Sequence, residues 1–455
     1  MDLTTIVKAY DVRGTVPDQL NEDIARAVGA AFVDVTQASR IVTAHDMRES
    51  GPGLVRAFAE GAMKRGASVI EAGLGSTDML YFASGHLDLP GAMFTASHNP
   101  AQYNGIKMCR ARAVAIGQDT GLAEIRALAE RYLDEGIAVA GNTGTVETVD
   151  LLAEYAAYMR QLVDLSGIRP LKVVVDAGNG MGGYTVPAVL GDAVLPPLPL
   201  TIVPMYFELD GSFPNHEANP LEPANIVDLQ KRVVAESADL GLAFDGDADR
   251  CFVVDATGGA VPPSAVTALV ATRELVKSPG ATIIHNLITS KAVPEIVAEH
   301  GGTALRTRVG HSFIKAEMAR TNAVFGGEHS AHYYFRDFWF ADTGMLAAMH
   351  VLAALGEQPA PLADLLAQYS RYVASGEVNT TVERPAEKVN QIKEAFAGKA
   401  VAVDELDGLT VELADGTWFN VRASNTEPLL RLNVEGPSQQ AMVAARDEAL
   451  AVIRG

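Results

Sequence analysis

The chain has 455 residues, of which 48% are hydrophobic and 20% charged, which is typical of a globular protein with about three or four domains. A net charge of −20 argues against the broad basic face that nucleic acid requires, so an anionic ligand would need a local cluster of cations. Two widely separated cysteines offer no disulfide framework, and no apolar run approaches the ~18 residues of a membrane span. We therefore expect a cytoplasmic protein.

Helical and strand-like periods alternate from the start of the chain, which favours α/β layers with largely parallel sheets. In the first part we expect helices over residues 21–35 and 53–64, and strands over 40–43, 68–71 and 93–95. A second series begins with a helix over 151–165 and a strand over 171–175. A third has a helix over 262–276, a strand over 281–286 and a helix over 293–300.

The pattern of apolar and polar residues changes from about Ser375. Residues 378–382 and 418–421 alternate apolar and polar side chains, and a helical period over 386–397 lies between them. Alternation of this kind is typical of antiparallel strands with one buried face. The C-terminal part is therefore predicted to be a smaller α+β domain.

A polar loop after the strand over 93–95 reads Thr95-Ala-Ser-His-Asn-Pro100. A serine at the end of a strand can act as a nucleophile, and His98 and Lys107 lie near it in the sequence. A serine hydrolase is disfavoured because no Gly-x-Ser-x-Gly turn is present, and because an adjacent histidine cannot easily reach back to the Ser97 hydroxyl. Taken alone, the loop favours a turn with a capping serine over an active site.

Gly178, Gly180 and Gly183 follow the strand over 171–175 at the spacing of a dinucleotide-binding turn. That motif also needs an acidic residue at the end of the next strand, where it binds the ribose. The corresponding interval, 192–204, is rich in proline and ends without such an acid. Because glycine-rich turns between a strand and a helix are common for geometric reasons, we do not predict a dinucleotide site.

Asp245, Asp247 and Asp249 place three carboxylates at alternate positions between two apolar runs, 240–244 and 251–254. Such a cluster needs a cation, and oxygen donors suit Mg²⁺ or Ca²⁺. An EF-hand is excluded because arginine and alanine occupy the positions of its glycine and its last glutamate. The adjacent arginine, Arg250, suits a phosphate ligand. A hairpin turn with solvated acids is the alternative reading.

Several motifs, taken together and in this order, resemble those of the α-D-phosphohexomutases, and most closely the bacterial phosphomannomutase/phosphoglucomutase group. They are the opening motif 10–14, the serine loop 95–100 with Asn104-Gly-Ile-Lys107, the metal loop 245–250, the sugar loop 327–332 and the phosphate loop 422–428. The resemblance covers nearly the whole chain. It implies a heart-shaped molecule with a central cleft, in which three similar α/β units with mixed sheets precede a C-terminal α+β domain. The four expected domains are residues 1–145, 146–254, 255–370 and 371–455.

The resemblance also implies an activity. The protein would interconvert mannose 6-phosphate and mannose 1-phosphate, and glucose phosphates too, through a phosphoserine at Ser97 and a hexose 1,6-bisphosphate intermediate that also serves as activator. We expect a hexose phosphate as the partner, no nucleic acid or membrane, and a monomer or weak homodimer. The alternatives are a phosphoglucosamine mutase, a hydrolase that passes the phosphoryl group of Ser97 to water, and a sugar-phosphate sensor without catalysis.

Roles for the catalytic residues follow from the same resemblance. Ser97 and the three aspartates of the metal loop would hold Mg²⁺, while Arg13 and Arg250 stabilise the transferring phosphoryl group. Lys107 is the candidate general acid/base, with a pKa lowered towards neutrality by other cations. His98 would either orient Ser97 or transfer a proton.

The substrate would be held by residues of the third and fourth domains. Glu328 and Ser330 suit the sugar hydroxyls, and His332 lies in the same loop. The phosphate that is not transferred would bind guanidinium, hydroxyl and backbone groups. The candidates for this phosphate and for the cleft wall are Arg422, Ser424, Asn425, Thr426, Arg431, Lys291 and His311.

Two positions of the sugar loop depart from the family pattern. Ala331 stands where a glycine is common, so the loop is strained if that backbone needs a positive φ. His329 is unusual for enzymes that act on both mannose and glucose phosphates. The choice between these sugars is therefore left open, whereas Thr95 leans against the phosphoglucosamine branch.

Overall fold

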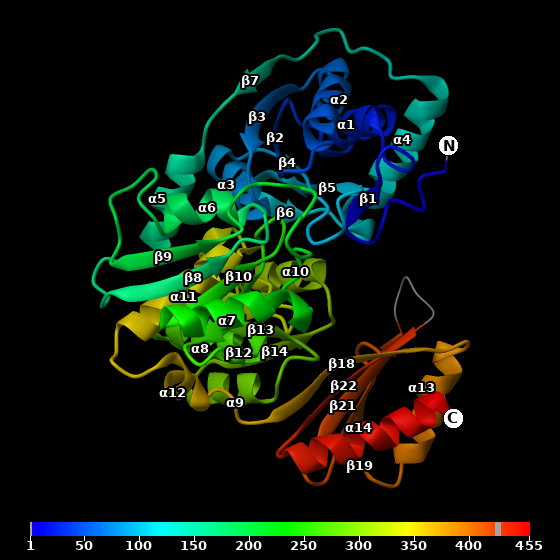
Figure 1. The fold of residues 1–455 in the computed structure, drawn as a ribbon. Helices are drawn as coiled ribbons and strands as arrows, with labels where there is room; N and C mark the ends of the chain where they lie inside the picture. The colour runs from blue at the N-terminus through cyan, green and yellow to red at the C-terminus, as the bar shows by residue number, and fades with distance from the viewer. Residues whose placement is uncertain (1, 424–428) are drawn as a thin grey trace.

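The computed structural model describes residues 2–423 and 429–455, apart from the side chain of His311, and contains four sheets that follow one another along the chain (Figure 1). The first three sheets mix parallel and antiparallel pairs and are covered by helices, while the fourth is antiparallel. This confirms the predicted fold class of three α/β units followed by an α+β domain.

The first unit orders its strands β1-β5-β4-β2-β3-β7, with β6 paired to β5. The strands are β1 (Asp11–Thr15), β2 (Arg40–His45), β3 (Ser68–Leu74), β4 (Gly91–Phe94), β5 (Tyr103–Arg110), β6 (Val114–Ala115) and β7 (Val146–Thr148). The helices are α1 (Glu22–Thr36), α2 (Gly51–Lys64), α3 (Thr77–Leu87) and α4 (Leu122–Glu135). Ser76 caps α3 by accepting a hydrogen bond from the Met79 amide.

The second and third sheets share one plan, in which three parallel strands continue into two antiparallel ones. The second contains β8 (Leu171–Asp176), β9 (Leu200–Met205), β10 (Leu240–Phe244), β11 (Cys251–Asp255) and β12 (Ala260–Val261), with α5 (Leu152–Leu162), α6 (Gly182–Val189) and α7 (Val227–Glu236). The third contains β13 (Thr282–Asn286), β14 (Thr303–Thr307), β15 (Phe325–Gly327), β16 (Tyr333–Phe335) and β17 (Ala341–Asp342). Its helices are α8 (Pro263–Lys277), α9 (Ala292–Glu299), α10 (His311–Thr321), α11 (Gly344–Gly356) and α12 (Leu362–Ala367).

The fourth sheet follows the order β18-β22-β21-β20-β19 and stands beside the third unit (Figure 1). Its elements are β18 (Val373–Thr381), β19 (Ala400–Asp404), β20 (Leu409–Leu413), β21 (Trp418–Ala423), β22 (Leu429–Gly436), α13 (Pro385–Phe396) and α14 (Gln439–Arg454). Short 3-10 helices elsewhere cover Ala111–Ala113, Gln118–Thr120, Pro223–Ile226 and Arg336–Phe338. No helix among the described residues is both long and apolar enough to cross a membrane.

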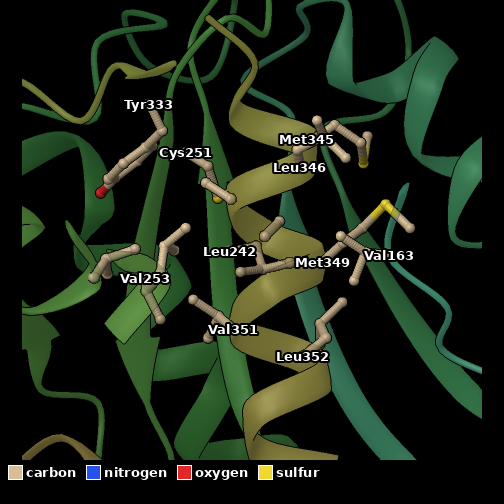
Figure 2. Close-up of a cluster of buried hydrophobic side chains, with 14 of the residues drawn as sticks. Val163, Leu242, Cys251, Val253, Tyr333, Met345, Leu346, Met349, Val351 and Leu352 are labelled. Atoms are coloured by element: carbon tan, nitrogen blue, oxygen red, sulfur yellow. The ribbon is translucent and has the colours of Figure 1, made fainter. Parts of the chain in front are cut away.

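One hydrophobic core runs through the first three units, whereas the fourth has a core of its own. All residues of α11 are buried, and Figure 2 shows how side chains of this helix, such as Met349, lie beside Leu242 and Cys251 of the second sheet. Cys109 and Cys251 are both free and buried, and burial raises the pKa of each thiol. The shared core fixes the relative positions of the first three sheets.

Candidate active site

Three loops, one from each of the first three sheets, come together at the candidate site. Each loop joins the same pair of strands in the plan of its sheet. The serine loop lies between β4 and β5, the metal loop between β10 and β11, and the sugar loop between β15 and β16. In each case the first strand has a parallel neighbour and the second strand is antiparallel to the first. The carboxyl ends of parallel strands are where α/β sheets place ligand sites.

Ser97 is 5% exposed and has a left-handed backbone, with φ of 52°. Its Oγ donates a 2.8 Å hydrogen bond to Oδ2 of Asp245, and Nδ1 of His98 lies 3.3 Å from the same Oγ. The expectation that an adjacent histidine could not reach this hydroxyl is therefore wrong. The unusual φ turns the backbone sharply at Ser97, where the two neighbouring side chains come within reach of each other.

His98 also accepts a 2.7 Å hydrogen bond from Nη2 of Arg250 at its Nδ1 atom. Because a guanidinium only donates, Nδ1 must be unprotonated in this arrangement. Burial, reinforced by Arg250 and Arg13, lowers the pKa of His98 to about 2. The geometry thus favours an orienting role for His98 over proton transfer.

The three aspartates of the metal loop are at most 2% exposed, so the reading of this loop as a turn with solvated acids is wrong. Candidate ligand atoms of Asp245, Asp247 and Asp249 lie within 4.8 Å of one another. Oδ1 of Asp247 and Oδ1 of Asp249 are buried and accept no hydrogen bond from any described residue. Buried carboxylate oxygens without a donor are costly, so this donor set fits a hard divalent cation.

Lys107 contacts the same carboxylates from β5. Its Nζ donates 2.7 Å hydrogen bonds to Oδ2 of Asp247 and to Oδ2 of Asp249. Burial alone would lower the pKa of Lys107, but attraction to the two carboxylates outweighs burial and raises the pKa well above its usual value. The predicted lowering of this pKa is therefore wrong, because the nearest charges are anions rather than cations.

Cations also surround the serine hydroxyl. Arg250 donates from Nε and Nη2 to Oδ2 of Asp245, at 2.9 and 2.8 Å. Arg13 donates from Nη1 to Oδ1 of Asn99 at 2.7 Å and pairs with Asp11 through Nη2, while its buried Nε has no hydrogen-bond acceptor among the described residues. An unused donor on a side chain that contacts the serine loop suits an anionic ligand.

The metal loop touches the serine loop through a glycine. A Cβ at Gly246 would lie 2.3 Å from the carbonyl oxygen of Ser97. On the other side, a Cβ at Gly180 would lie 2.6 Å from the carbonyl oxygen of Gly246. The glycine-rich turn after β8 therefore has a structural reason, which is to let the metal loop sit close to Ser97.

The sugar loop is joined to the metal loop by an isolated backbone bridge between His332 and Arg250. Glu328 is 3% exposed, and its carboxylate accepts hydrogen bonds from Asn286 at 3.1 Å and from the Tyr334 hydroxyl at 2.8 Å. The Ser330 hydroxyl lies 3.0 Å from Nδ1 of His332. The loop thus reaches the same centre as the other two.

Ala331 adopts φ of 64° and is fully buried. The backbone at this position is therefore left-handed, which glycine tolerates and alanine does not favour. The strain expected from the departure at this position is present in the sugar loop.

The fourth domain places two arginines in register on neighbouring strands, Arg422 of β21 and Arg431 of β22. Both pair with Glu377, at 3.4 and 3.0 Å. Burial lowers the pKa of His329 to about 4, with Glu377 opposing and Arg422 reinforcing this effect, so His329 of the sugar loop lies within electrostatic range of these charges. Ser424, Asn425 and Thr426, the other predicted phosphate ligands, lie outside the described residues.

Lys291 and His311, the two remaining predicted residues of the third domain, lie outside the three loops. Lys291 pairs through Nζ with Glu412 of the fourth domain at 2.8 Å, and its backbone amide donates to Glu435. It therefore stands at the junction between the third and fourth domains rather than beside Ser97. His311 is the first residue of α10 and follows Gly310, whose amide donates a long 3.4 Å hydrogen bond to Glu328.

Comparisons with known proteins agree along the whole chain. Models of the phosphoglucomutase/phosphomannomutase alpha/beta/alpha domains I, II and III match residues 4–135, 153–258 and 262–372, and the model of the C-terminal domain matches 377–452. A phosphomannomutase of Escherichia coli is 38% identical over 100% of both chains. A relative from Xanthomonas campestris named as phosphohexose mutases is 39% identical over 98% of this chain and 99% of its own.

A crystal structure of a phosphoglucomutase/phosphomannomutase family protein from Burkholderia thailandensis superposes with a TM-score of 0.88 at 32% identity. It covers 100% of this chain and 98% of the other. The chain belongs to the phosphoglucomutase/phosphomannomutase family. It is a phosphohexomutase, an isomerase of hexose phosphates.

In this phosphohexomutase a cavity of about 430 Å³ opens between the first, third and fourth domains. Tyr10 and Arg308 line it together with Arg422, one of the predicted phosphate ligands. Arg308 lies over the ring of Phe313, 4.7 Å from its centroid. Neither Tyr10 nor Arg308 was singled out from the sequence as a ligand, although Tyr10 opens the first motif of the family.

Two further residues contact the loops of this phosphohexomutase. They were not predicted from the sequence, because neither belongs to a recognised motif. Thr77, at the start of α3, donates from its hydroxyl to Oδ2 of Asp247 at 2.6 Å. Arg48, just after β2, donates to several carbonyls in and beside the serine loop. The only signal for both was their place after a strand, at the edge where the loops meet.

Proposed function

We propose that this phosphohexomutase interconverts mannose 6-phosphate and mannose 1-phosphate, and also accepts glucose phosphates, by way of a phosphoserine at Ser97 and a hexose 1,6-bisphosphate. The observation that carries the proposal is the hydrogen bond from Ser97 Oγ to Asp245, inside a ring of buried carboxylates and cations. The names of the relatives support the choice of mannose phosphates.

Ser97, Asp245, Asp247 and Asp249 would hold Mg²⁺. A bound Mg²⁺ ion would withdraw charge from the oxygens of the transferring phosphoryl group. Phosphoryl transfer depends mainly on positioning and charge neutralisation, which is the chemistry that this set of residues offers.

The chain's own cations complete the neutralisation. Arg250, hydrogen-bonded to Asp245 and His98, would receive phosphoryl oxygens beside Ser97. Arg13, whose Nε has no acceptor in the described part of the chain, would do the same. Because Lys107 is charged, it is suited to neutralise the same group. A cation held by Asp247 and Asp249 would lower the pKa of Lys107 again, which donation of a proton to the departing sugar oxygen requires.

The sugar would bind between the third and fourth domains. Glu328, Ser330 and His332 would contact its hydroxyls, in either orientation of the bisphosphate. The phosphate that is not transferred would bind Arg422 and Arg431. Both arginines form ion pairs with Glu377, which holds them side by side. Further ligands on this side would be Ser424, Asn425, Thr426, Lys291 and His311.

The test compares kcat/KM for mannose 1-phosphate, glucose 1-phosphate and glucosamine 1-phosphate, with Mg²⁺ and hexose 1,6-bisphosphate present. We expect mannose 1-phosphate to be preferred, and Ser97→Ala to lose at least about 10³-fold in turnover because the phosphoryl acceptor is gone. Preference for glucosamine 1-phosphate would point to the phosphoglucosamine mutase instead. Release of free phosphate without isomerisation would indicate a hydrolase, and failure on all three sugars would contradict the mutase.

A further inference from the structure

Arg48 is a buried arginine, 2% exposed, whose five N–H donors all have acceptors. Its Nη2 donates to the carbonyl oxygens of Ser97 and Asn99, at 2.9 and 2.7 Å. Its Nη1 donates to the carbonyl oxygens of Pro100 and Tyr103, both at 2.9 Å. Nε donates to Asp46 at 3.2 Å. One side chain therefore binds four carbonyls within the seven residues 97–103.

Asp46 extends this network to the other side of Ser97. Its carboxylate accepts the backbone amide of Arg48 at 3.0 Å, and its own amide donates to the carbonyl of Phe94. Asp46 also has a hydrogen bond with the Thr95 side chain, and Oγ1 of Thr95 accepts the amide of Ser97 at 2.9 Å. The amide and the carbonyl of Ser97 are thus both tied, directly or through Thr95, to the Asp46–Arg48 pair.

The backbone of Ser97 needs such support. A left-handed φ of 52° is unfavourable in a residue other than glycine, so the surrounding contacts must hold it. Arg48 itself is enclosed by the second domain, because the Phe213 ring lies 5.2 Å from its Cζ and a Cβ at Gly211 would lie 2.9 Å from its Cα. The guanidinium therefore has little freedom to move away from the loop.

We propose that Arg48 is a positioning residue for phosphoryl transfer, which fixes Ser97 Oγ relative to the metal loop without touching the substrate. This inference rests on the proposed phosphoserine cycle. Lysine could not replace Arg48, because a single ammonium has three donors and lacks the flat fork that serves four carbonyls at once.

The test measures kcat and KM for mannose 1-phosphate in Arg48→Lys at saturating Mg²⁺ and hexose 1,6-bisphosphate. A displacement of about 1 Å at a reacting atom costs roughly 100-fold, so we expect kcat to fall about 100-fold. KM should stay within about twofold of the wild-type value, because the proposed sugar and phosphate contacts lie on other domains. Intact mass should show slower phosphorylation of Ser97 by the bisphosphate.

Arg160→Lys is the matched control. Arg160 donates from its guanidinium to the carbonyls of Val189, Gly191 and Pro196, in a part of the second domain that contacts none of the loops. This variant should lower Tm and leave kcat unchanged. A role of Arg48 in stability alone would make the two variants behave alike.

The outcomes separate the two proposals. An inactive wild-type enzyme would reject the proposed function itself. An active wild type, with kcat of Arg48→Lys within about threefold of it or no lower than that of Arg160→Lys, would reject the positioning role. If Arg48→Lys does not fold, Asp46→Asn decides by the same criteria, since it removes one acceptor of Arg48 and should lower kcat about tenfold with KM unchanged.

Discussion

Lys107 is a cation whose protonation is governed by two buried carboxylates of the metal loop. Its ammonium lies 2.7 Å from both Asp247 and Asp249, and these carboxylates raise its pKa. The sequence places the lysine ten residues after Ser97 but does not say which charges the fold brings to it. In the protein without a cation, Lys107 is the main counter-charge of the two carboxylates.

Lys107→Met should therefore make the protein more dependent on Mg²⁺ for stability. Breaking a buried ion pair costs on the order of 3 kcal/mol, and a bound cation would restore the balance. We expect Mg²⁺ to raise the Tm of this variant by roughly 3–4 °C more than that of the wild type, measured by calorimetry with Mg²⁺ or EDTA. Lys172→Met, which breaks a surface pair with Glu236, is the control and should respond to Mg²⁺ as the wild type does. An equal response of all three proteins would contradict this prediction.

At the scale of elements, the regular helices and strands were predictable because their periodicity is local. The helix expected over 21–35 is α1, Glu22–Thr36, and the strand expected over 171–175 is β8, Leu171–Asp176. β7 was missed, because its three residues, Val146–Thr148, are all exposed and show no alternation of burial. The closeness of the metal loop to the serine loop was also unpredictable, since it depends on how two sheets pack.

Gly246→Ala tests that closeness. The added Cβ would meet the carbonyl oxygen of Ser97 at 2.3 Å, so the metal loop must shift away from Ser97. We expect kcat to fall about 100-fold, with a loss of about 1–3 kcal/mol in the free energy of unfolding. The control is Gly167→Ala in the same domain, where a Cβ would have no atom within 4 Å. Activity and stability of the control should match the wild type, and equal activity of Gly246→Ala would show that the loops need not touch.

At the scale of the whole molecule, Asp78 joins the first three domains through one buried carboxylate. It accepts hydrogen bonds from the hydroxyls of Ser76 at the start of α3, Tyr155 in α5 and Thr343 at the start of α11. Its partners Tyr155 and Thr343 are 77 and 265 residues away in the sequence, so no local pattern indicates them. The four-domain class was predictable from the order of the motifs, but the contacts that lock three domains together were not.

Asp78→Asn should remove a pH dependence of stability. Burial raises the pKa of Asp78 to about 6, above its unfolded value near 3.8, so the folded state binds the proton more tightly. The stability that protonation gives is complete below about pH 4 and is lost as the pH rises through 6. Between pH 5 and pH 7, the free energy of unfolding of the wild type should fall by about 1 kcal/mol relative to that of Asp78→Asn. The measurement is urea denaturation of both proteins at the two pH values, and a constant difference would count against the raised pKa.

The burial of both thiols has a practical consequence for experiments on motion. Since burial raises the pKa of Cys109 and of Cys251, neither should react readily with maleimide dyes near neutral pH. Cysteines introduced at Val276 of the third domain and Val401 of the fourth, both well exposed, would then be the reactive pair. The two native cysteines therefore need not be replaced before dyes are attached to these positions. Fluorescence energy transfer between the dyes would report the distance between the two domains that enclose the proposed sugar site.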